Sequence, residues 1–97
     1  MRNASGGALI RASYYSSGRR TASGEVFRPG GFTAANRTLP FGTLLRLTNP
    51  STGRTVTVRV NDRGPFVAGR SLDVSRGAAV ALGMIAKGTA TLRMERV

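Results

Sequence analysis

Cysteine and histidine are both absent from this chain of 97 residues. The lack of cysteine excludes a disulfide framework, a thiolate nucleophile and a cysteine-based zinc site. The lack of histidine excludes imidazole acid–base catalysis and a Ser-His-Asp triad. We predict that the chain binds no metal ion and no cofactor.

Acidic residues are also scarce, because four of them stand against 15 lysines and arginines, which gives a net charge of +11. Acid–base chemistry must therefore draw on the carboxyls, on the two consecutive tyrosines or on the single lysine. The four carboxyls belong to Glu25, Asp62, Asp73 and Glu95, the tyrosines are Tyr14 and Tyr15, and the lysine is Lys87.

The excess of positive charge is almost entirely arginine, whose planar fork suits carboxylate and phosphate groups. One interpretation is an anionic polymer as partner: nucleic acid, an anionic lipid surface or acidic cell-wall material. The other is a basic solvated surface with no dedicated partner. The arginines are spread from Arg2 to Arg96 without a run, so they predict no basic arm.

Long apolar runs are missing, since no stretch approaches the roughly 18–20 apolar residues of a membrane span. Residues 1–10 show no signal peptide, so the chain is cytoplasmic or begins after a removed signal. The length predicts one domain at 8–97 after a disordered lead-in at 1–7. We expect a monomer.

Alternation of apolar and polar residues predicts short strands. The clearest pair, Leu44–Asn49 and Arg54–Asp62, forms a hairpin around the turn at 50–53. Ser75 and Gly83 are expected to cap a short helix at Arg76–Leu82. The other expected strands are Ala8–Tyr15, Glu25–Phe27, Phe32–Ala35, Ser71–Val74 and Thr89–Val97. This pattern predicts a small barrel, which removes open sheet edges.

Asp62 shares the alternation of Val56, Val58 and Val60, so it is expected to point inward at the end of its strand. An inward carboxylate must be hydrogen-bonded or paired. It either accepts hydrogen bonds from the backbone of the turn that follows or acts as a general acid with a pKa tuned by burial. The pattern leaves both interpretations open.

The other polar candidates have ordinary explanations of their own. Asp73 stands two residues before the expected helix cap and predicts hydrogen bonding at the helix start. Glu25 follows Gly24 near a loop and predicts an exposed side chain. Of Tyr14 and Tyr15, one packs inward, and the other packs at a rim or stacks on a sugar ring or base.

Five segments in order carry a resemblance that covers nearly the whole chain: Ala12–Tyr15, Thr21–Phe27, Thr33–Thr43, Val60–Phe66 and Gly69–Ser75. The stretches Leu-Pro-Phe-Gly-Thr at 39–43 and Asn-Asp-Arg-Gly-Pro-Phe at 61–66 are specific in combination. Together they resemble the double-psi β-barrel domain of the rare lipoprotein A family. The resemblance implies a mainly β fold, a six-stranded double-psi β-barrel with one or two short helices, related to the first domain of expansins.

The same resemblance implies a protein of the bacterial cell envelope, in the periplasm or outer membrane, that binds peptidoglycan glycan strands. It implies a lytic transglycosylase reaction, in which a carboxylic acid protonates the glycosidic oxygen and a 1,6-anhydromuramyl end forms. By position, Asp62 matches the acid–base group and Glu25 a second acid. The implied substrate contacts are Asn36, Tyr15, Thr33, Arg63 and Arg28, and the expected structural residues are Asp73, Gly64 and Pro65.

Two positions depart from the family pattern. Family members usually carry histidine where this chain has Asn36, and many carry aspartate where it has Arg28. Asparagine cannot carry a proton, and Arg28 reverses a charge and is expected to lower the pKa of a nearby carboxyl. We therefore expect glycan binding with weakened catalysis.

Two alternatives remain open: a basic barrel that binds nucleic acid or another anionic polymer, and an expansin-like module that loosens polymer without cutting it. The low aromatic content of 6% and the lack of a recognition helix disfavour the nucleic-acid alternative.

Overall fold

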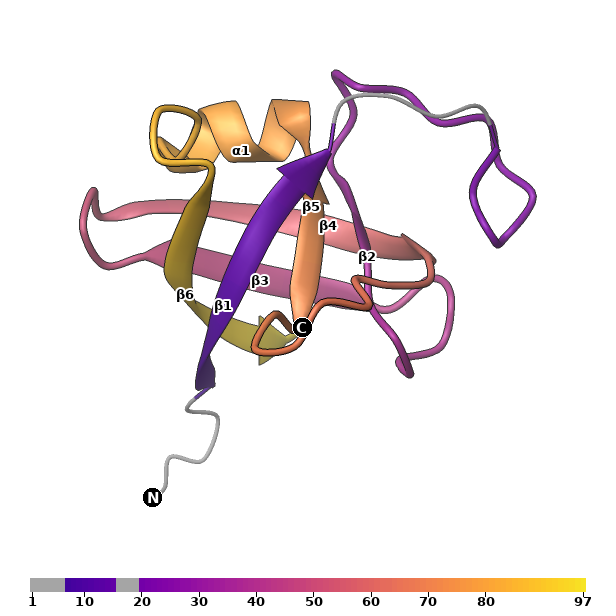
Figure 1. Ribbon diagram of the computed structural model, residues 1–97, viewed down its shortest axis with the longest axis horizontal. Helices are drawn as coiled ribbons and strands as arrows, with labels where there is room; N and C mark the ends of the chain where they lie inside the picture. Colours follow the sequence, from indigo (N-terminus) through magenta and orange to yellow (C-terminus); the bar gives the residue numbers. More distant parts are fainter. Residues whose placement is uncertain (1–6, 16–19) are drawn as a thin grey trace.

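The computed structural model describes residues 7–15 and 20–97, which form a closed barrel of six strands with one helix (Figure 1). The strands are β1 (Ala8–Tyr15), β2 (Thr33–Ala35), β3 (Leu44–Asn49), β4 (Arg54–Asp62), β5 (Leu72–Ser75) and β6 (Thr89–Arg96), and the helix is α1 (Arg76–Leu82). The mainly β class and the six-stranded barrel confirm the prediction. The predicted lead-in at 1–7 lies outside the described residues except for Gly7.

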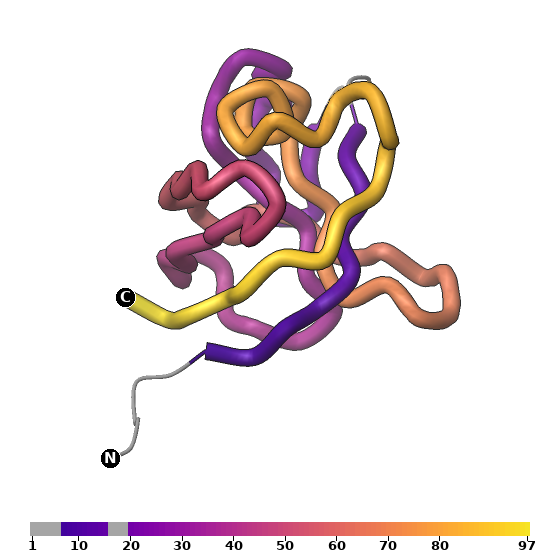
Figure 2. Tube along the Cα trace, turned by 90° about the vertical axis from the view of Figure 1, so that its left-hand side faces the viewer, coloured from indigo at the N-terminus to yellow at the C-terminus, as the bar shows by residue number. Residues whose placement is uncertain are grey.

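The strands follow the order β1-β5-β2-β4-β3-β6 around the barrel. β1 pairs with β5 and β2 pairs with β4 in parallel, whereas the other four pairings are antiparallel. Figure 2 shows β1 and β6, the first and last strands, running side by side to close the barrel. Closure gives every strand two hydrogen-bonded neighbours, so the short strands leave no open sheet edge.

The core lies inside the barrel and under α1. Along β3 and β4, alternate residues face the interior, and Leu45, Leu47 and Val58 are almost fully buried. Burying a leucine or valine side chain contributes about 1.5–3 kcal/mol each. The alternation that predicted the hairpin is therefore also the pattern that fills the barrel.

The helix α1 has the predicted caps. Ser75 accepts a hydrogen bond from the backbone N–H of Ala78, and Gly83 adopts the left-handed conformation at φ 73°. Near its start, the N–H of Gly77 donates to the Pro29 carbonyl at 2.8 Å. A Cβ at Gly77 would come within 2.6 Å of the Gly30 carbonyl oxygen, so this contact requires glycine. Within residues 7–15 and 20–97, no helix has the length and apolar character needed to cross a membrane.

The segment before β2 differs from the prediction. Residues 25–27 form no strand, and Val26 makes only an isolated bridge with Arg20. A tight turn explains the difference, because the N–H groups of Thr21 and Gly24 donate to the carbonyls of Glu25 and Thr21. The turn holds residues 21–25 beside the end of β4 instead of extending them along a sheet.

Candidate functional site

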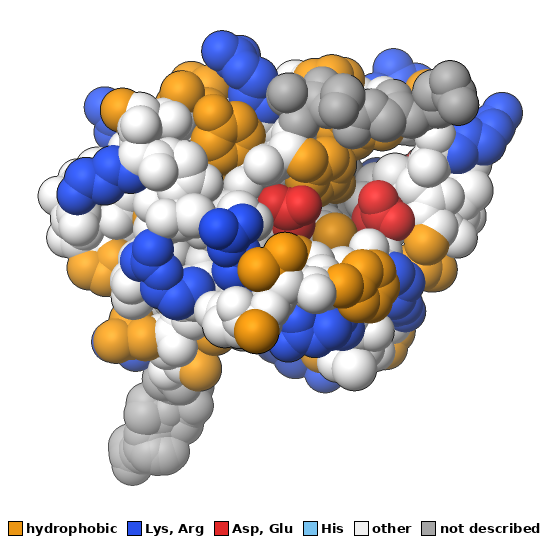
Figure 3. All heavy atoms as spheres, viewed as in Figure 1, with side chains coloured by type: hydrophobic (Ala, Val, Ile, Leu, Met, Phe, Trp, Pro, Cys, Tyr) orange, Lys and Arg blue, Asp and Glu red, His pale blue; other side chains and the backbone are white. Residues whose placement is uncertain are grey.

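Three of the four carboxyl groups lie in one part of the barrel: Asp62 is bonded to the 20–31 segment, its neighbour Asn61 is bonded to Glu25, and its charge acts on Asp73. Asp62 ends β4, Asp73 lies in β5, and Glu25 lies in the 20–31 segment. Figure 3 shows acidic side chains set into a hollow on one face and bordered by basic and apolar side chains. We call Glu25, Asp62 and Asp73 the carboxylate cluster. The fourth, Glu95, lies apart from it, 3.7 Å from Arg46.

A register shift positions Asp62. Ala34 pairs with Val60 but Ala35 pairs with Asp62, so Asn61 is an extra residue in the β4 edge. Asp62 is consequently only half-buried. Its Oδ1 accepts hydrogen bonds from the N–H groups of Ala22 and Arg63, both at 2.8 Å, and its Oδ2 has no hydrogen-bond partner among the described residues. The backbone interpretation fits Oδ1, and no described residue forms a hydrogen bond with Oδ2.

Asp73 is the carboxyl most affected by burial. Burial raises its pKa, a nearby Asp62 charge raises it further, and the hydroxyl of Ser13 and the charge of Arg70 oppose the shift. The Ser13 hydroxyl donates to Asp73 Oδ1 at 2.9 Å across the β1–β5 pairing. At the helix start, the N–H of Ala78 donates to the Ser75 hydroxyl and not to Asp73. Asp73 thus holds a proton to higher pH than an ordinary aspartate does.

Glu25 has the opposite character. Both its oxygens accept hydrogen bonds from the Arg59 guanidinium at 2.9 Å, and Oε1 also accepts from Asn61 Nδ2 at 2.8 Å. The hydrogen bonds from Arg59 hold the pKa of Glu25 below its usual value. Glu25 is therefore a fixed negative charge at neutral pH and is poorly suited to donate a proton. Its predicted role as an acid stays a prediction.

The sequence analysis missed Arg59 and Asn61. Arg59 stands between the inward-facing Val58 and Val60, so the alternation of β4 indicates that it faces outward. That alternation was the signal in the sequence that the Arg59 side chain lies at the surface. It does not predict the ion pair, because Glu25 lies in an irregular segment 34 residues away.

Tyr15 contributes a buried hydroxyl beside the cluster. Burial raises its pKa to about 12, and the charges of Asp62 and Asp73 add to the shift while the neighbouring Thr33 hydroxyl opposes it. Its ring packs on Phe27, with ring centroids 4.7 Å apart. The hydroxyl oxygens of Tyr15 and Thr33 are both buried without a hydrogen-bond partner among the described residues. The two hydroxyls are neighbours inside the fold, close enough for the Thr33 hydroxyl to lower the pKa of Tyr15 against the effect of burial.

Asn36 and Arg63 hold the loop after β2. Asn36 Oδ1 accepts from the N–H groups of Thr38 and Leu39, and Asn36 Nδ2 donates to the Ser71 carbonyl. The Arg63 guanidinium donates to the carbonyls of Asn36 and Leu39. Both side chains are thus committed to backbone groups, and their predicted substrate contacts stay predictions.

The loop between β4 and β5 projects from the barrel (Figure 2). Gly64 has φ 125°, a conformation that favours glycine. The Arg37 guanidinium donates to the carbonyls of Pro65 and Arg70, both at 2.7 Å. These bonds hold the loop against the barrel, and the structural roles expected of Gly64 and Pro65 stay predictions.

Two aromatic rings lie near the residues that follow β4, and the sequence analysis did not single them out. The Arg63 guanidinium lies 4.0 Å from the centre of the Phe41 ring. Phe66, four residues after Asp62, is 79% exposed. Arg28 is also exposed, but among the described residues it forms no ion pair with the cluster. Arg59, not Arg28, lowers the pKa of a carboxyl here.

Residues suited to a metal ion are not grouped in the part of the chain that the structure describes. It contains no set of three or more histidine, cysteine, aspartate or glutamate side chains that could hold one. What the site offers is a half-buried carboxyl with a raised pKa, an ionised carboxylate and two buried hydroxyls. These groups can transfer a proton and bind a hydroxyl-rich ligand.

Comparison with known proteins finds a matching family and several similar chains. A family model described as lytic transglycolase matches residues 8–94. The chain is 59% identical over 78 residues to a probable endolytic peptidoglycan transglycosylase RlpA of Nostoc sp., covering 80% of the chain and 21% of the relative. It is 53% identical over 88 residues to a protein of the same description from Treponema pallidum, covering 88% of the chain and 28% of the relative. The chain therefore spans about a quarter of the length of these relatives.

Solved structures of similar fold belong to proteins of other kinds. The Streptomyces papain inhibitor superposes with a TM-score of 0.76 at 20% identity, covering 93% of both chains, a likeness that shows the fold alone. A variant of the Clavibacter michiganensis expansin, in complex with cellohexaose, superposes with a TM-score of 0.73 at 25% identity. That match covers 92% of this chain and 49% of the expansin.

Proposed function

The chain belongs to the lytic transglycolase family of double-psi β-barrels, and from that premise we propose that it binds peptidoglycan glycan strands at the carboxylate cluster. The observation that carries the proposal is the gathering of three of the four carboxyls on one part of the barrel, in a chain whose relatives are described as peptidoglycan transglycosylases. The expansin bound to cellohexaose supports a glycan polymer as the class of ligand.

Each part of the site suits a glycan. The Oδ2 of Asp62, which has no hydrogen-bond partner among the described residues, accepts hydrogen bonds from sugar hydroxyls. The exposed ring of Phe66 offers a flat apolar surface for a sugar ring at the border. A few convergent polar groups beside apolar surface are typical of small-molecule and sugar sites.

The reaction we propose is slow lytic transglycosylation. A protonated carboxyl gives its proton to the glycosidic oxygen while the 6-hydroxyl of the muramyl sugar attacks C1, so the glycosidic bond breaks and a 1,6-anhydro bond forms. The hydroxyl proton returns to the carboxylate, and no water is consumed. Burial of Asp73 supports it as the proton donor, with Asp62, the acid–base group implied by the family pattern, beside it.

Turnover is expected to be weak. Asn36 stands where family members usually carry histidine, and its amide is bonded to backbone groups. Asparagine cannot move a proton, so only carboxyls remain for acid–base work. Glu25, whose two oxygens are held by Arg59, is then suited to bind sugar hydroxyls and not to move a proton.

We also propose a setting for the protein. We place the protein in the bacterial cell envelope, in the periplasm or outer membrane, as a monomer whose residues 8–97 form a single domain. One closed barrel with one core supports the single domain. The comparisons lend no support to the nucleic-acid alternative.

The test is incubation with purified sacculi, both intact and stripped of stem peptides. Soluble 1,6-anhydro products are measured by mass spectrometry, and bound protein is measured by sedimentation. Asp62→Asn and Asp73→Asn are compared with Glu95→Gln, a matched loss of one carboxyl outside the cluster.

We expect product from the wild type and from Glu95→Gln, and little from either aspartate variant. Sedimentation without product would leave a binding module that does not cut. Neither product nor sedimentation would overturn the cell-wall function.

A further inference from the structure

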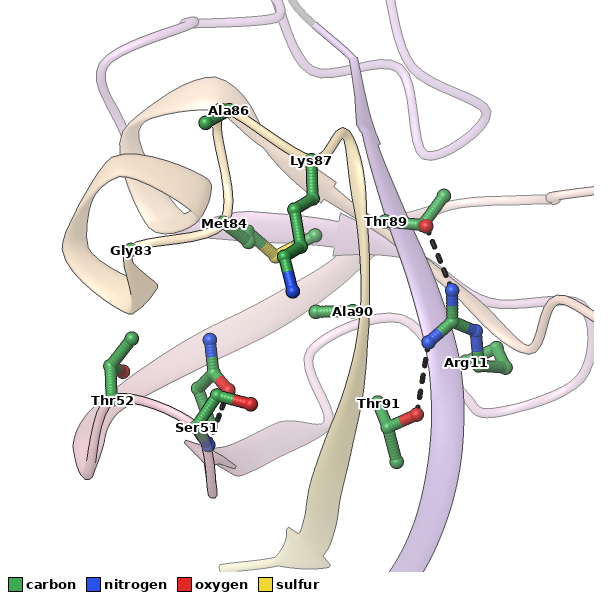
Figure 4. A pocket seen from close by; sticks show the side chains of 11 residues that line it. Arg11, Ser51, Thr52, Gly83, Met84, Ala86, Lys87, Thr89, Ala90 and Thr91 are labelled. Carbon is green, nitrogen blue, oxygen red and sulfur yellow. Dashed lines mark hydrogen bonds between the residues drawn. The ribbon is translucent and has the colours of Figure 1, made fainter.

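A second concavity lies away from the carboxylate cluster. It is a pocket of about 420 Å³ between the β3–β4 turn, the segment after α1, β1 and β6 (Figure 4). The β3–β4 turn and the 20–31 segment lie on opposite sides of the barrel in Figure 1. We call this the basic pocket, and its polar side chains come mainly from Arg11, Asn49, Ser51, Lys87, Thr89 and Thr91.

Positive charge in this pocket has no acidic counterpart. Arg11 and Lys87 line it, whereas none of the four carboxyl side chains of the whole sequence does. Those carboxyls are accounted for elsewhere, three in the cluster and one beside Arg46. A concave basic surface without its own counter-charge attracts an anion.

Arg11 is oriented by neutral groups. Its two terminal nitrogens donate to the hydroxyls of Thr91 at 3.0 Å and Thr89 at 2.8 Å. These bonds hold the guanidinium without neutralising it, since hydroxyls carry no charge. Arg59 differs, because its fork is occupied by the Glu25 carboxylate. Each terminal nitrogen of Arg11 keeps one further N–H, so the side chain offers its charge and these remaining donors to an incoming oxyanion.

Lys87 and Ser51 complete the donor set. Figure 4 shows the Lys87 ammonium directed into the pocket, toward the turn that carries Ser51 and Thr52. The nearby end of α1 does not oppose an anion strongly, because Asn49 Nδ2 and the Thr52 hydroxyl already donate to the Leu82 carbonyl. Among the described residues, the Ser51 hydroxyl has no hydrogen-bond partner and is free to donate.

We propose that the basic pocket binds a phosphate group. Two positive charges match a phosphate monoester, which carries about 1.5–2 negative charges at neutral pH. The arginine fork, the ammonium and the hydroxyl together supply more donors than a carboxylate needs. The volume exceeds that of a phosphate alone, so the group can be free or attached to a sugar or a lipid headgroup.

The experiment is a titration of the ¹⁵N-labelled protein with inorganic phosphate at constant ionic strength, followed by backbone amide shifts. Arg11→Gln and Lys87→Gln each remove one charge from the pocket. Arg76→Gln removes one charge from an exposed position outside it and is the matched control. Arg11→Lys keeps the charge but removes the fork, and the dispersion of the spectra reports whether each variant is folded.

We expect shifts confined to residues 11, 51–52 and 83–91, and affinity at least about tenfold weaker in each pocket variant, with no change in Arg76→Gln. Shifts scattered over the surface, or equal weakening in Arg76→Gln, would overturn the site. Acetate binding as tightly as phosphate would overturn the phosphate assignment. Glucose 6-phosphate and vesicles containing phosphatidic acid then identify the source of the phosphate group. Binding of the first indicates a sugar phosphate, binding of the second indicates a lipid headgroup, and binding of neither indicates free phosphate.

Discussion

The carboxylate cluster and the basic pocket are two polar sites on one small barrel, and they use charge in opposite ways. The cluster gathers three of the four carboxyls and neutralises one of them with Arg59. The basic pocket contains two cations and no carboxyl. A net charge of +11 describes neither site, because each depends on which residues the strands bring together.

The difference also shows how one fold separates two environments. Asp73 is half-buried against Ser13, so its surroundings disfavour the charged form. Arg11 is exposed and its neighbours are hydroxyls, so its charge remains available. The helix α1 connects the two regions, since Gly77 at its start touches the 28–31 turn and Gly83 at its end lines the basic pocket.

The largest expected effect comes from removing the proton donor. Asp73→Asn should lower the formation of 1,6-anhydro product by about 100-fold or more, since general acid catalysis contributes roughly 10²–10⁴-fold. Mass spectrometry of sacculus digests measures the loss. Phosphate shifts in the basic pocket should remain, and their loss would show that the two sites are not separate.

A tight backbone contact on the cluster side gives the next effect. Gly77→Ala places a Cβ 2.6 Å from the Gly30 carbonyl oxygen, so α1 must move away from the turn. We expect a loss of about 1–3 kcal/mol in the free energy of unfolding, the usual cost of overpacking. Urea unfolding measures it, with Gly30→Ala as control, because a Cβ at Gly30 meets nothing within 4 Å. Equal stability of the two variants would contradict the contact.

Reversing the charge of Lys87 tests the basic pocket in the same way. Lys87→Glu gives the basic pocket the carboxyl that it lacks, so phosphate binding should weaken by more than the roughly tenfold expected for Lys87→Gln. The amide-shift titration measures this change. Product formation at the cluster should not change, and a parallel fall in product would argue that the pocket is part of the glycan site.

The smallest effects appear in the dependence of stability on pH. The pKa of Asp73 is higher in the folded state than in the unfolded state. The free energy of unfolding therefore falls as the pH rises from the unfolded-state pKa of Asp73 through its folded-state pKa. Glu25 has a lowered pKa, so its contribution is present above its unfolded pKa and is lost as pH falls through the folded value. At neutral pH, Asp73→Asn should therefore be slightly more stable and Glu25→Gln slightly less stable than the wild type.

Urea unfolding at a series of pH values tests both signs. The Glu25→Gln difference should disappear in acid, and a difference that persists there would mean that packing, not charge, causes it.

Much of the fold could be predicted from the sequence because its signals are local. The alternation in Leu44–Asn49 and Arg54–Asp62 predicted β3 and β4 with their observed bounds, and Ser75 and Gly83 predicted both ends of α1. The strand expected at 25–27 failed because a tight turn at 21–25 competes with extension. The extra residue at Asn61 also escaped prediction, since it shows only in the pairing with β2.

The candidate site was only partly predictable. The motif at 61–66 and the Gly-Glu pair at 24–25 indicated Asp62 and Glu25. Neither indicated that Arg59 would keep Glu25 ionised, or that burial would raise the pKa of Asp73 instead. A pKa depends on neighbours in space, and those neighbours are set by strand pairing and loop closure.

By itself, then, the sequence determined the strands, the capped helix, the closed barrel and the family, because periodicity and capping act over a few residues. Only the tertiary structure decided which charges are used. The Ser13–Asp73 bond joins residues 60 positions apart, and the Arg11–Thr91 bond joins residues 80 positions apart. Contacts over such separations arise when the barrel closes, so the cluster and the basic pocket exist only in the folded chain.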